Sequence, residues 1–183
     1  MSTLAIIVAA APSLTAPAPP APEPLDQAIS LSIPSTDGAR GAQLTYERWM
    51  PERRWSVAAS AELRESAIGD YTGLRAGVGV AIRKYWRADA YLSKLPAGNM
   101  VGWFYGGGAY LAADFTHDNA DHRWLSSALS YGVTAVIGYR IVPWRQLAIT
   151  PSAGFEWQHD LATRIPDWNL AGAIVGLDAG WLF

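Results

Sequence analysis

The sequence predicts an all-β protein, an eight-stranded antiparallel transmembrane up-and-down β-barrel. Three observations support this fold class. From Ala28 onward, apolar residues alternate with small or polar ones, which is the period of a β-strand. Hydrophobic residues make up 50% of the 183-residue chain and charged residues only 16%, against roughly 25% in a typical soluble domain. The second face of the alternating segments carries mainly Gly, Ser, Thr and Ala, which is typical of a narrow, filled barrel interior.

Composition also excludes several classes of protein. The chain has no cysteine, so it has neither disulfides nor a cysteine-based metal site. Its net charge is −2 and its two lysines are Lys84 and Lys94, so it lacks the basic surface of a nucleic-acid-binding protein. No stretch reaches the roughly 18 to 20 continuous apolar residues of a membrane-spanning helix. The sequence predicts no cofactor.

Residues 1–26 form a signal-like segment followed by a Pro/Ala-rich leader, and residues 27–183 form the predicted barrel. Leu4 to Ala11 is an apolar run that resembles the core of a signal peptide. No Lys or Arg precedes Arg40, so the usual positive start is missing. Two interpretations stay open: a signal peptide that is degenerate or whose true start lies upstream, or a disordered Ala/Pro leader. Under both, Pro12 to Pro24 is a linker that favours an extended backbone.

The segments that follow are predicted strands, of which the first two show the weakest alternation. In chain order they are Ala28 to Ser35, Gly41 to Trp49, Trp55 to Arg64, Tyr71 to Trp86, Val101 to Thr116, Trp124 to Arg140, Leu147 to Trp157 and Asn169 to Phe183. The last is the clearest, because its odd positions are apolar from Ala171 to Phe183 and three of its six even positions from 172 to 182 are glycine. A soluble β-protein would carry Lys, Glu and Asn on that second face, and a lipocalin-type barrel would be apolar inside. The bulky apolar face is therefore predicted to meet lipid.

Aromatic residues gather near the predicted strand ends, as in the aromatic belts of membrane barrels. With both termini in the periplasm, the inner belt would comprise Trp49, Trp55, Tyr85, Trp86, Trp103, Tyr139, Trp144, Trp181 and Phe183. The outer belt would comprise Tyr71, Phe115, Trp124, Trp157 and Trp168. The alternative is a soluble sandwich with these aromatics in its core. The four outer connections are short, whereas the inner connection from Arg87 to Met100 is long enough for a short interfacial helix around Ala88 to Leu95.

The C-terminal Trp181-Leu182-Phe183, the run Gly102 to Gly106, and Gly138-Tyr139-Arg140 followed by Trp144 resemble small outer-membrane barrels of the OmpA/OmpX kind. The resemblance covers about Gln27 to Phe183. It implies an outer-membrane location in a Gram-negative-type cell, with outer-membrane lipid and lipopolysaccharide as surroundings. It also implies that Trp181 and Phe183 are read by the outer-membrane assembly machinery. Because such a resemblance is architectural, it implies little about activity.

Charged residues at predicted inward positions form the main candidate site. They are Glu47, Glu62, Arg64, Arg75, Arg83, Asp114, Arg140, Glu156 and Asp178. Unpaired charge in a narrow lumen is costly, and a guanidinium can bridge two carboxylates, so we expect a paired network. A structural plug is the favoured interpretation, and a proton or ion relay is the alternative.

Two sharper hypotheses concern the predicted outer loops. His117, His122 and His159, with neighbouring aspartates, are weak candidates for a metal site if strand pairing brings His122 near His159. A lipid A-modifying enzyme would need His122 with Ser126 or Ser127, oriented by Glu156 or Asp160. Neither pattern is specific. The sequence therefore favours a non-enzymatic structural or interaction barrel with a filled lumen and no open pore. A lipid A-modifying enzyme and a surface-binding barrel are the alternatives.

Overall fold

The structure is a computed structural model that describes residues 25–33, 35–36, 39–50, 55–68, 70–86, 100–144, 146–161 and 169–183. Most of the predicted leader and the predicted interfacial helix around Ala88 to Leu95 lie outside the described residues. Leu25 and Asp26, which the sequence placed in the leader, contact the barrel. Leu25 packs against buried apolar residues, and the Asp26 carbonyl accepts a hydrogen bond from the Trp49 amide at 2.7 Å.

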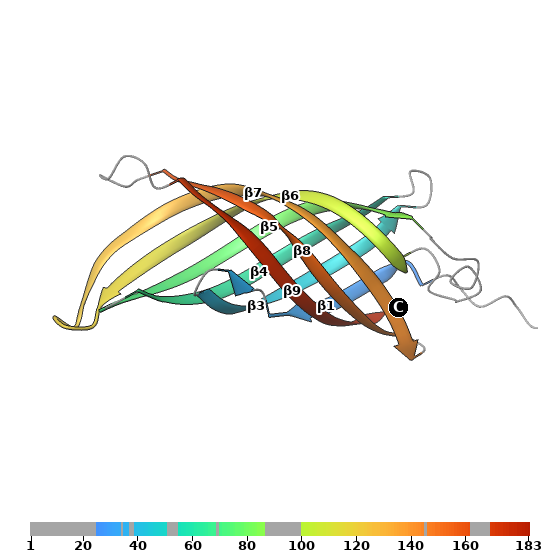
Figure 1. Cartoon of the computed structure of the whole chain (residues 1–183), viewed down its shortest axis with the longest axis horizontal. Helices are drawn as coiled ribbons and strands as arrows, with labels where there is room; N and C mark the ends of the chain where they lie inside the picture. The colour runs from blue at the N-terminus through green and yellow to red at the C-terminus, as the bar shows by residue number, and fades with distance from the viewer. Residues whose placement is uncertain are drawn as a thin grey trace, which may run out of the picture.

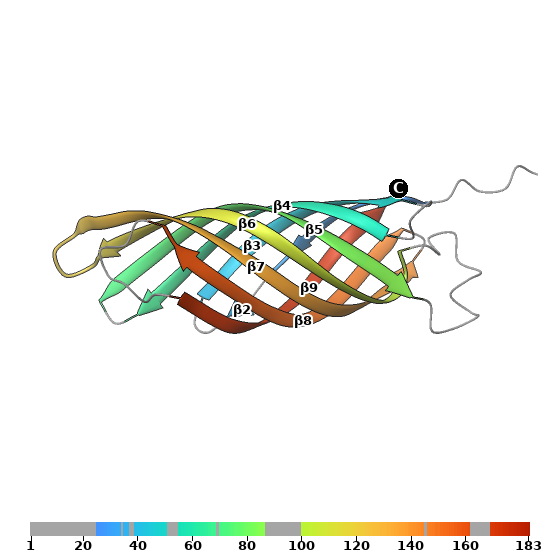
Figure 2. The ribbon, with the colours of Figure 1, turned by 90° about the horizontal axis from the view of Figure 1, so that it is seen from above.

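The described residues form a closed antiparallel β-barrel (Figures 1 and 2). Its elements are β1 (Gln27–Ser32), β2 (Ser35–Thr36), β3 (Ala39–Met50), β4 (Trp55–Ile68), β5 (Tyr71–Trp86), β6 (Gly102–Asp118), β7 (Arg123–Trp144), β8 (Leu147–Asp160) and β9 (Asn169–Leu182). From β3 to β9 each strand pairs with the next along the chain, and β1 closes the barrel by pairing with both β3 and β9. Since β1 and β2 both lie between β3 and β9, they are two parts of one strand, and the barrel has the predicted eight strands.

The first strand of the barrel, made of β1 and β2, is shorter than its neighbours β3 and β9. β1 pairs with β9 up to Ser32 opposite Asp178, and β2 adds the pair of Ser35 with Val175. The sequence has Pro34 at this interruption, a residue without an amide N–H for the ladder. Beyond Val175, β9 pairs with β8 alone among the described residues.

The two ends of the barrel are distinct. Gln27 and Phe183 exchange backbone hydrogen bonds of 3.0 and 2.9 Å, so both ends of the described chain lie at one end of the barrel, here the terminal end. The connections β4–β5, β6–β7 and β8–β9 lie at the opposite end (Figure 1). β7 is the longest strand, with 22 residues, and it runs past β8 at the opposite end because Ser130 already pairs with Asp160, the last residue of β8.

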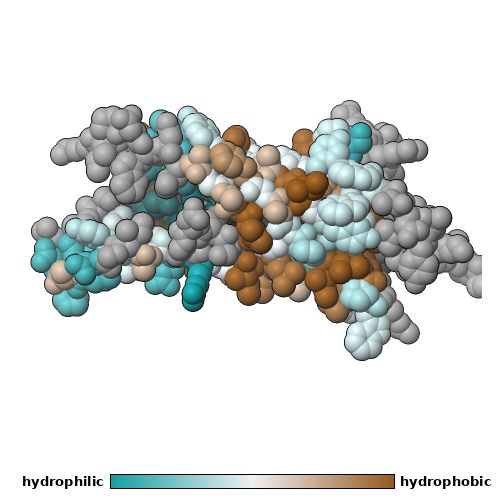
Figure 3. Space-filling view, viewed as in Figure 1, coloured by the Kyte–Doolittle hydropathy of each residue, from teal (hydrophilic) through white to brown (hydrophobic). Residues whose placement is uncertain are grey.

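Strand alternation gives the wall an apolar outer face. Among the described residues, the exposed outward aliphatic side chains include Leu44, Val57, Leu63, Leu74, Val78, Val80, Ile82, Leu111, Leu129, Val133, Ile137, Val175 and Leu177. Leu147 and Ile149, also predicted to face lipid, are half-buried. Figure 3 shows apolar side chains gathered over the middle of the barrel and hydrophilic ones at the opposite end. A surface of this kind is unfavourable in water and suits a hydrocarbon environment.

The aromatic belt at the terminal end differs from the prediction at two positions. Trp55, Trp86, Trp103, Trp144, Trp181 and Phe183 are exposed on the outside. Trp49 and Tyr85, assigned to the same belt, are instead only 7% exposed and point inward. The reason is parity: Trp49 lies two residues from inward Glu47, and Tyr85 two residues from inward Arg83. At the opposite end Tyr71 and Phe115 are exposed, whereas the Trp124 side chain and Trp168 lie outside the described residues.

No helix in the described part of the chain is long and apolar enough to cross a membrane.

Candidate functional site: the charged lumen

The terminal end of the lumen is packed with apolar side chains, here called the terminal plug. Its buried members are Ala28, Trp49, Tyr85, Met100, Val101, Phe104, Ala148 and Leu182. They come from strands all around the barrel and from the residues before β6, so together they span the lumen. The ring of Phe104 lies directly against Gly138, where an added Cβ would be 2.4 Å from Phe104 Cζ. Glycine at this position lets the ring cross the barrel.

Next to the plug, on its side toward the opposite end of the barrel, lies the Glu47 cluster, made of Glu47, Arg83 and Arg140. Glu47 Oε2 is 2.9 Å from Arg83 Nη1 and 2.8 Å from Arg140 Nη2. The side chains of Glu47 and Arg140 are each only 1% exposed. The three residues come from β3, β5 and β7, so this cluster ties together strands that do not pair with one another.

Neutral donors complete the coordination of the Glu47 carboxylate. Its Oε1 accepts hydrogen bonds from the Ser56 hydroxyl and, at 3.0 Å, from the Tyr85 hydroxyl. Arg140 also donates to Thr150 Oγ1 at 3.1 Å. With four donors on one carboxylate, the high cost of removing this charge from water is offset by charge-assisted hydrogen bonds.

Aromatic faces and one further acid complete the surroundings of the two arginines. The guanidinium of Arg140 lies 5.4 Å from the Tyr85 ring centroid, and that of Arg83 lies 5.3 Å from the Phe104 centroid. These distances are within the range of cation–π interactions. Asp178 of β9 is 8% exposed and interacts electrostatically with both arginines. Two acids therefore balance two arginines in this part of the lumen.

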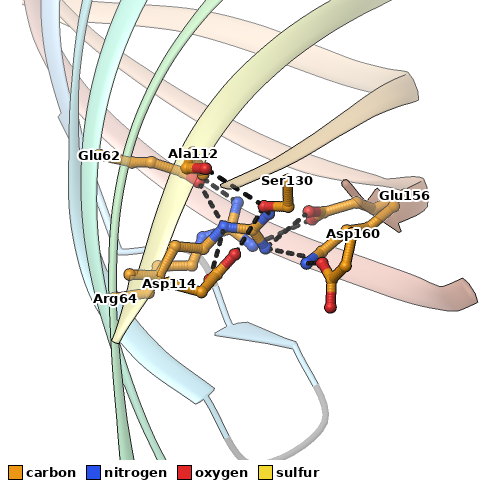
Figure 4. Close-up of polar contacts among 9 residues, drawn as sticks. Glu62, Arg64, Ala112, Asp114, Ser130, Glu156 and Asp160 are labelled. Carbon is orange, nitrogen blue, oxygen red and sulfur yellow. Dashed lines mark hydrogen bonds and ion pairs between the residues drawn. The ribbon is translucent and has the colours of Figure 1, made fainter. Parts of the chain in front are cut away.

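Nearer the opposite end lies the Glu156 cluster, made of Glu62, Arg64, Arg75, Asp114 and Glu156 (Figure 4). Arg64 bridges two carboxylates, with Nη2 2.7 Å from Glu62 Oε2 and Nη1 2.9 Å from Glu156 Oε2. Arg75 lies between three carboxylates at longer range, 3.6 Å from Glu62, 3.6 Å from Asp114 and 3.5 Å from Glu156. Two arginines thus face three carboxylates, which leaves one negative charge in excess.

Polar side chains extend the Glu156 cluster toward the opposite end. Arg75 donates to Gln158 Oε1 at 2.6 Å and to the Ser130 hydroxyl at 3.2 Å. Ser130 donates to Asp114 at 2.6 Å, and Gln158 donates to Asp160 at 2.9 Å (Figure 4). The Arg75 guanidinium also lies 4.9 Å from the centroid of Tyr110. The chain of contacts runs from mid-lumen toward the end of the barrel at which β8 ends.

A cavity of about 110 Å³ separates the two clusters. It is lined by Arg83 and Asp178 on one side and by Glu62, Arg64 and Tyr110 on the other. Between them, the wall contributes hydroxyl and amide groups, namely Ser32, Gln43, Thr45, Ser60, Thr134 and Ser152. Apolar groups such as Phe104 and Val136 also line this space, which is large enough to hold several water molecules.

The structure thus places all nine sequence-predicted charges on the inner face of the barrel, but it divides them between two groups. Eight of them form the ion pairs described above, and Asp178 lines the cavity beside Arg83. Strand alternation in the sequence puts Ser56, Ser130 and Thr150 on the small, polar face with the charges, but their role as hydrogen-bond partners was not predicted. Tyr85 and Gln158 were not predicted as lumen residues, although their parity with Arg83 and Glu156 would have assigned them to the lumen.

The proposed metal site is not assembled. Pairing of β7 with β8 puts His159 opposite Tyr131, nine residues from His122 and so about 30 Å along the strand. The expectation that strand pairing brings these histidines together was wrong. At the opposite end of the barrel β8 stops at Asp160, opposite Ser130, whereas β7 extends seven residues farther, to Arg123. His159 instead stacks on the outward ring of Trp157, and His117 lies 3.1 Å from the Asn119 amide oxygen. The described residues contain no cluster of three or more metal-ligating side chains.

The residues of the enzyme hypothesis are likewise dispersed. Glu156 pairs across the sheet with Thr134, twelve residues from His122, and its carboxylate is bound to arginines inside the lumen. Asp160 lies opposite Ser130 rather than near His122, and Ser127 is exposed. The side chain of Ser126 lies outside the described residues. Among the described residues of this hypothesis, neither Glu156 nor Asp160 lies beside His122.

The two aromatics of the expected assembly signal lie at the barrel seam. Trp181 is 53% exposed on the outer face and pairs with Ile29 on one side and Leu147 on the other. Phe183 is 42% exposed and exchanges backbone hydrogen bonds with Gln27.

Comparison with known proteins supports the architecture. No family model matches the chain, and no curated protein matches its sequence. Among solved structures, it is similar to Neisserial surface protein A, with a TM-score of 0.51 and 7% identity over 86% of this chain and 95% of that chain. The attachment invasion locus protein Ail of Yersinia pestis aligns with a TM-score of 0.49 and 15% identity, over 86% of this chain and 99% of that chain. The likeness to Neisserial surface protein A, together with the strand pairing of this structure, shows that the chain has the fold of small eight-stranded outer-membrane barrels.

Proposed function

We propose that this protein is a structural or interaction barrel of a Gram-negative outer membrane, with a lumen filled by its own side chains and no open pore. The observation that carries this proposal is the combination of an apolar outer face with an interior crossed by the terminal plug and the Glu47 cluster. An eight-stranded barrel is only about wide enough to be filled by side chains. Here those side chains are held by ion pairs between non-adjacent strands, which stiffens the wall.

The same proposal includes orientation and surroundings. We infer that the terminal end faces the periplasm and that the opposite end, with its hydrophilic side chains, faces the cell exterior among lipopolysaccharide. Trp181 and Phe183 would then be available to the assembly machinery before the seam closes. Neither a catalytic group nor a cofactor is part of the proposal, and the role would be one of membrane structure or surface interaction.

The test is current through the purified protein in planar lipid bilayers, after β-rich circular dichroism and altered migration of unboiled samples on gels have shown insertion. We expect negligible single-channel current from the wild-type protein. A variant with Tyr85→Ala and Phe104→Ala removes two rings of the plug and should raise the frequency of current events. Phe155→Ala, which removes an outward ring that is 52% exposed, is the matched control. Steady channels from the wild-type protein would contradict a filled lumen.

A further inference from the structure

Two cations interrupt the apolar outer face near the terminal end. Arg48 is exposed on the outside of β3, following Leu44 and Tyr46 on the same face. Lys84 is half-exposed on the outside of β5, following Val80 and Ile82. A charge on the lipid-facing side of a membrane barrel is costly unless it reaches the headgroup region. Among the described residues of the wall, neither cation has an acidic partner in an ion pair.

The register places both cations beside the same strand. Lys84 pairs with Trp55 of β4, and its Nζ is 5.8 Å from the centroid of the Trp55 ring. Arg48 pairs with Val57 of β4 from the other side. Since neighbouring strands lie about 4.8 Å apart, the two backbones are separated by about 10 Å across the sheet. Both side chains are long enough to meet a single group lying over Trp55 and Val57.

The surroundings favour an anion at the membrane surface. No carboxylate among the described residues forms an ion pair with Arg48 or Lys84, and the nearby Glu47 points inward to its own arginines. Exposed aromatic rings lie around the site, with Trp86 and Tyr105 5.2 Å apart beside Lys84. Such rings mark the level where acyl chains meet headgroups. An anion at this level of a bilayer is a lipid phosphate.

We propose that Arg48, Lys84 and Trp55 form a binding site for the phosphate of an anionic glycerophospholipid in the leaflet at the terminal end. The two cations contact the phosphate from either side, and the indole of Trp55 holds the Lys84 ammonium between them. The acyl chains then lie along the apolar face formed by Val57 and Ile82. This inference rests on the proposed membrane insertion and adds a specific lipid contact to it.

The test is lipid retention measured by native mass spectrometry, with wild-type protein released from mixed micelles of phosphatidylglycerol and phosphatidylcholine of equal acyl composition. We expect preferential retention of phosphatidylglycerol. The double variant Arg48→Gln/Lys84→Gln should reduce this preference about 25-fold, because each basic residue at an anionic bilayer surface contributes about fivefold in binding. The control is Arg40→Gln, an exposed outward arginine of the same strand at its opposite end, which should keep the preference.

Gel mobility and circular dichroism of the same samples distinguish failure of the lipid site from failure of membrane insertion. If the double variant folds and still retains phosphatidylglycerol like the wild-type protein, the lipid site is refuted while insertion stands. Equal loss in Arg40→Gln would show a general charge effect and would also refute the site. If none of the proteins inserts into micelles as a β-barrel, the proposed function fails, and the lipid site with it.

Discussion

The two charge clusters of the lumen use the same residue types in different environments. In the Glu47 cluster one carboxylate receives four donors, and both Glu47 and Arg140 are 1% exposed. In the Glu156 cluster three carboxylates share two arginines, the Arg75 contacts are 3.5 to 3.6 Å long, and the side chain of Asp114 is 30% exposed. One cluster is compact and centred on a carboxylate that is almost fully buried, whereas the other is extended and includes the partly exposed Asp114.

We infer from this difference that burial, rather than the number of ion pairs, sets how much each charge contributes to the free energy of unfolding. Removing one partner from a deeply buried pair, such as Glu47 and Arg140, leaves an uncompensated charge in a low-dielectric interior. Removing one partner from a pair within reach of water leaves a charge that water can solvate. We therefore expect the Glu47 cluster to dominate stability although it contains fewer ion pairs. Four predictions follow from this comparison, from the largest effect to the smallest.

Glu47→Ala should cost about 3–5 kcal/mol of unfolding free energy, because it leaves Arg83 and Arg140 buried without their carboxylate. The measurement is urea-induced unfolding of the protein in lipid vesicles. Glu65→Ala, which removes an exposed outward glutamate of β4, is the matched control and should change stability little. Similar losses in both variants would mean that the Glu47 cluster is not a special source of stability.

Gly138→Ala should cost about 1–3 kcal/mol, since the new methyl group would overlap the Phe104 ring and lie 2.9 Å from the Pro151 carbonyl oxygen. The same unfolding experiment applies. Gly107→Ala is the control, because Gly107 faces outward and an added Cβ there meets only the Thr134 carbonyl oxygen, at 3.4 Å. If Gly138→Ala is as stable as Gly107→Ala, the terminal plug is looser than its geometry indicates.

Arg75→Met should cost about 1–2 kcal/mol, between the values for exposed and buried pairs. The loss should also depend on salt, because Asp114 of the Glu156 cluster is 30% exposed and charges near solvent are screened by ions. Unfolding free energies measured in low and high sodium chloride would show this. The loss for Glu47→Ala should stay nearly constant over the same range, and an equal salt dependence of both would remove the distinction between the clusters.

Asp114→Asn should have the smallest effect, below about 1 kcal/mol in either direction. Asp114 is the most exposed carboxylate of the Glu156 cluster, and its neutralisation leaves two acids with two arginines. The amide oxygen can still accept the hydrogen bond from Ser130. A loss comparable to that of Glu47→Ala, measured in the same vesicles, would show that the excess carboxylate is structurally required.

Sequence alternation alone determined that the chain is a barrel and which way most side chains face. A period of two admits only two faces, so the composition of each face identified the outside and the inside, and Arg75, Arg83 and Glu156 were assigned correctly to the lumen. The same rule would have turned Trp49 and Tyr85 inward. Their placement in a belt came from their position near strand ends, which is weaker information than parity.

Only the tertiary structure decided which charges meet. Glu47 and Arg140 are 93 residues apart in the chain, and their contact depends on the stagger of strands around the closed barrel. Alternation is insensitive to that stagger, because a shift of two residues leaves every face unchanged. The separation of His122 from His159 has the same origin, since strand length and register are set by the whole ladder. The sequence therefore determines whether each side chain faces into or out of the barrel. The closed sheet determines the position of each residue along the barrel axis and the residues that it contacts.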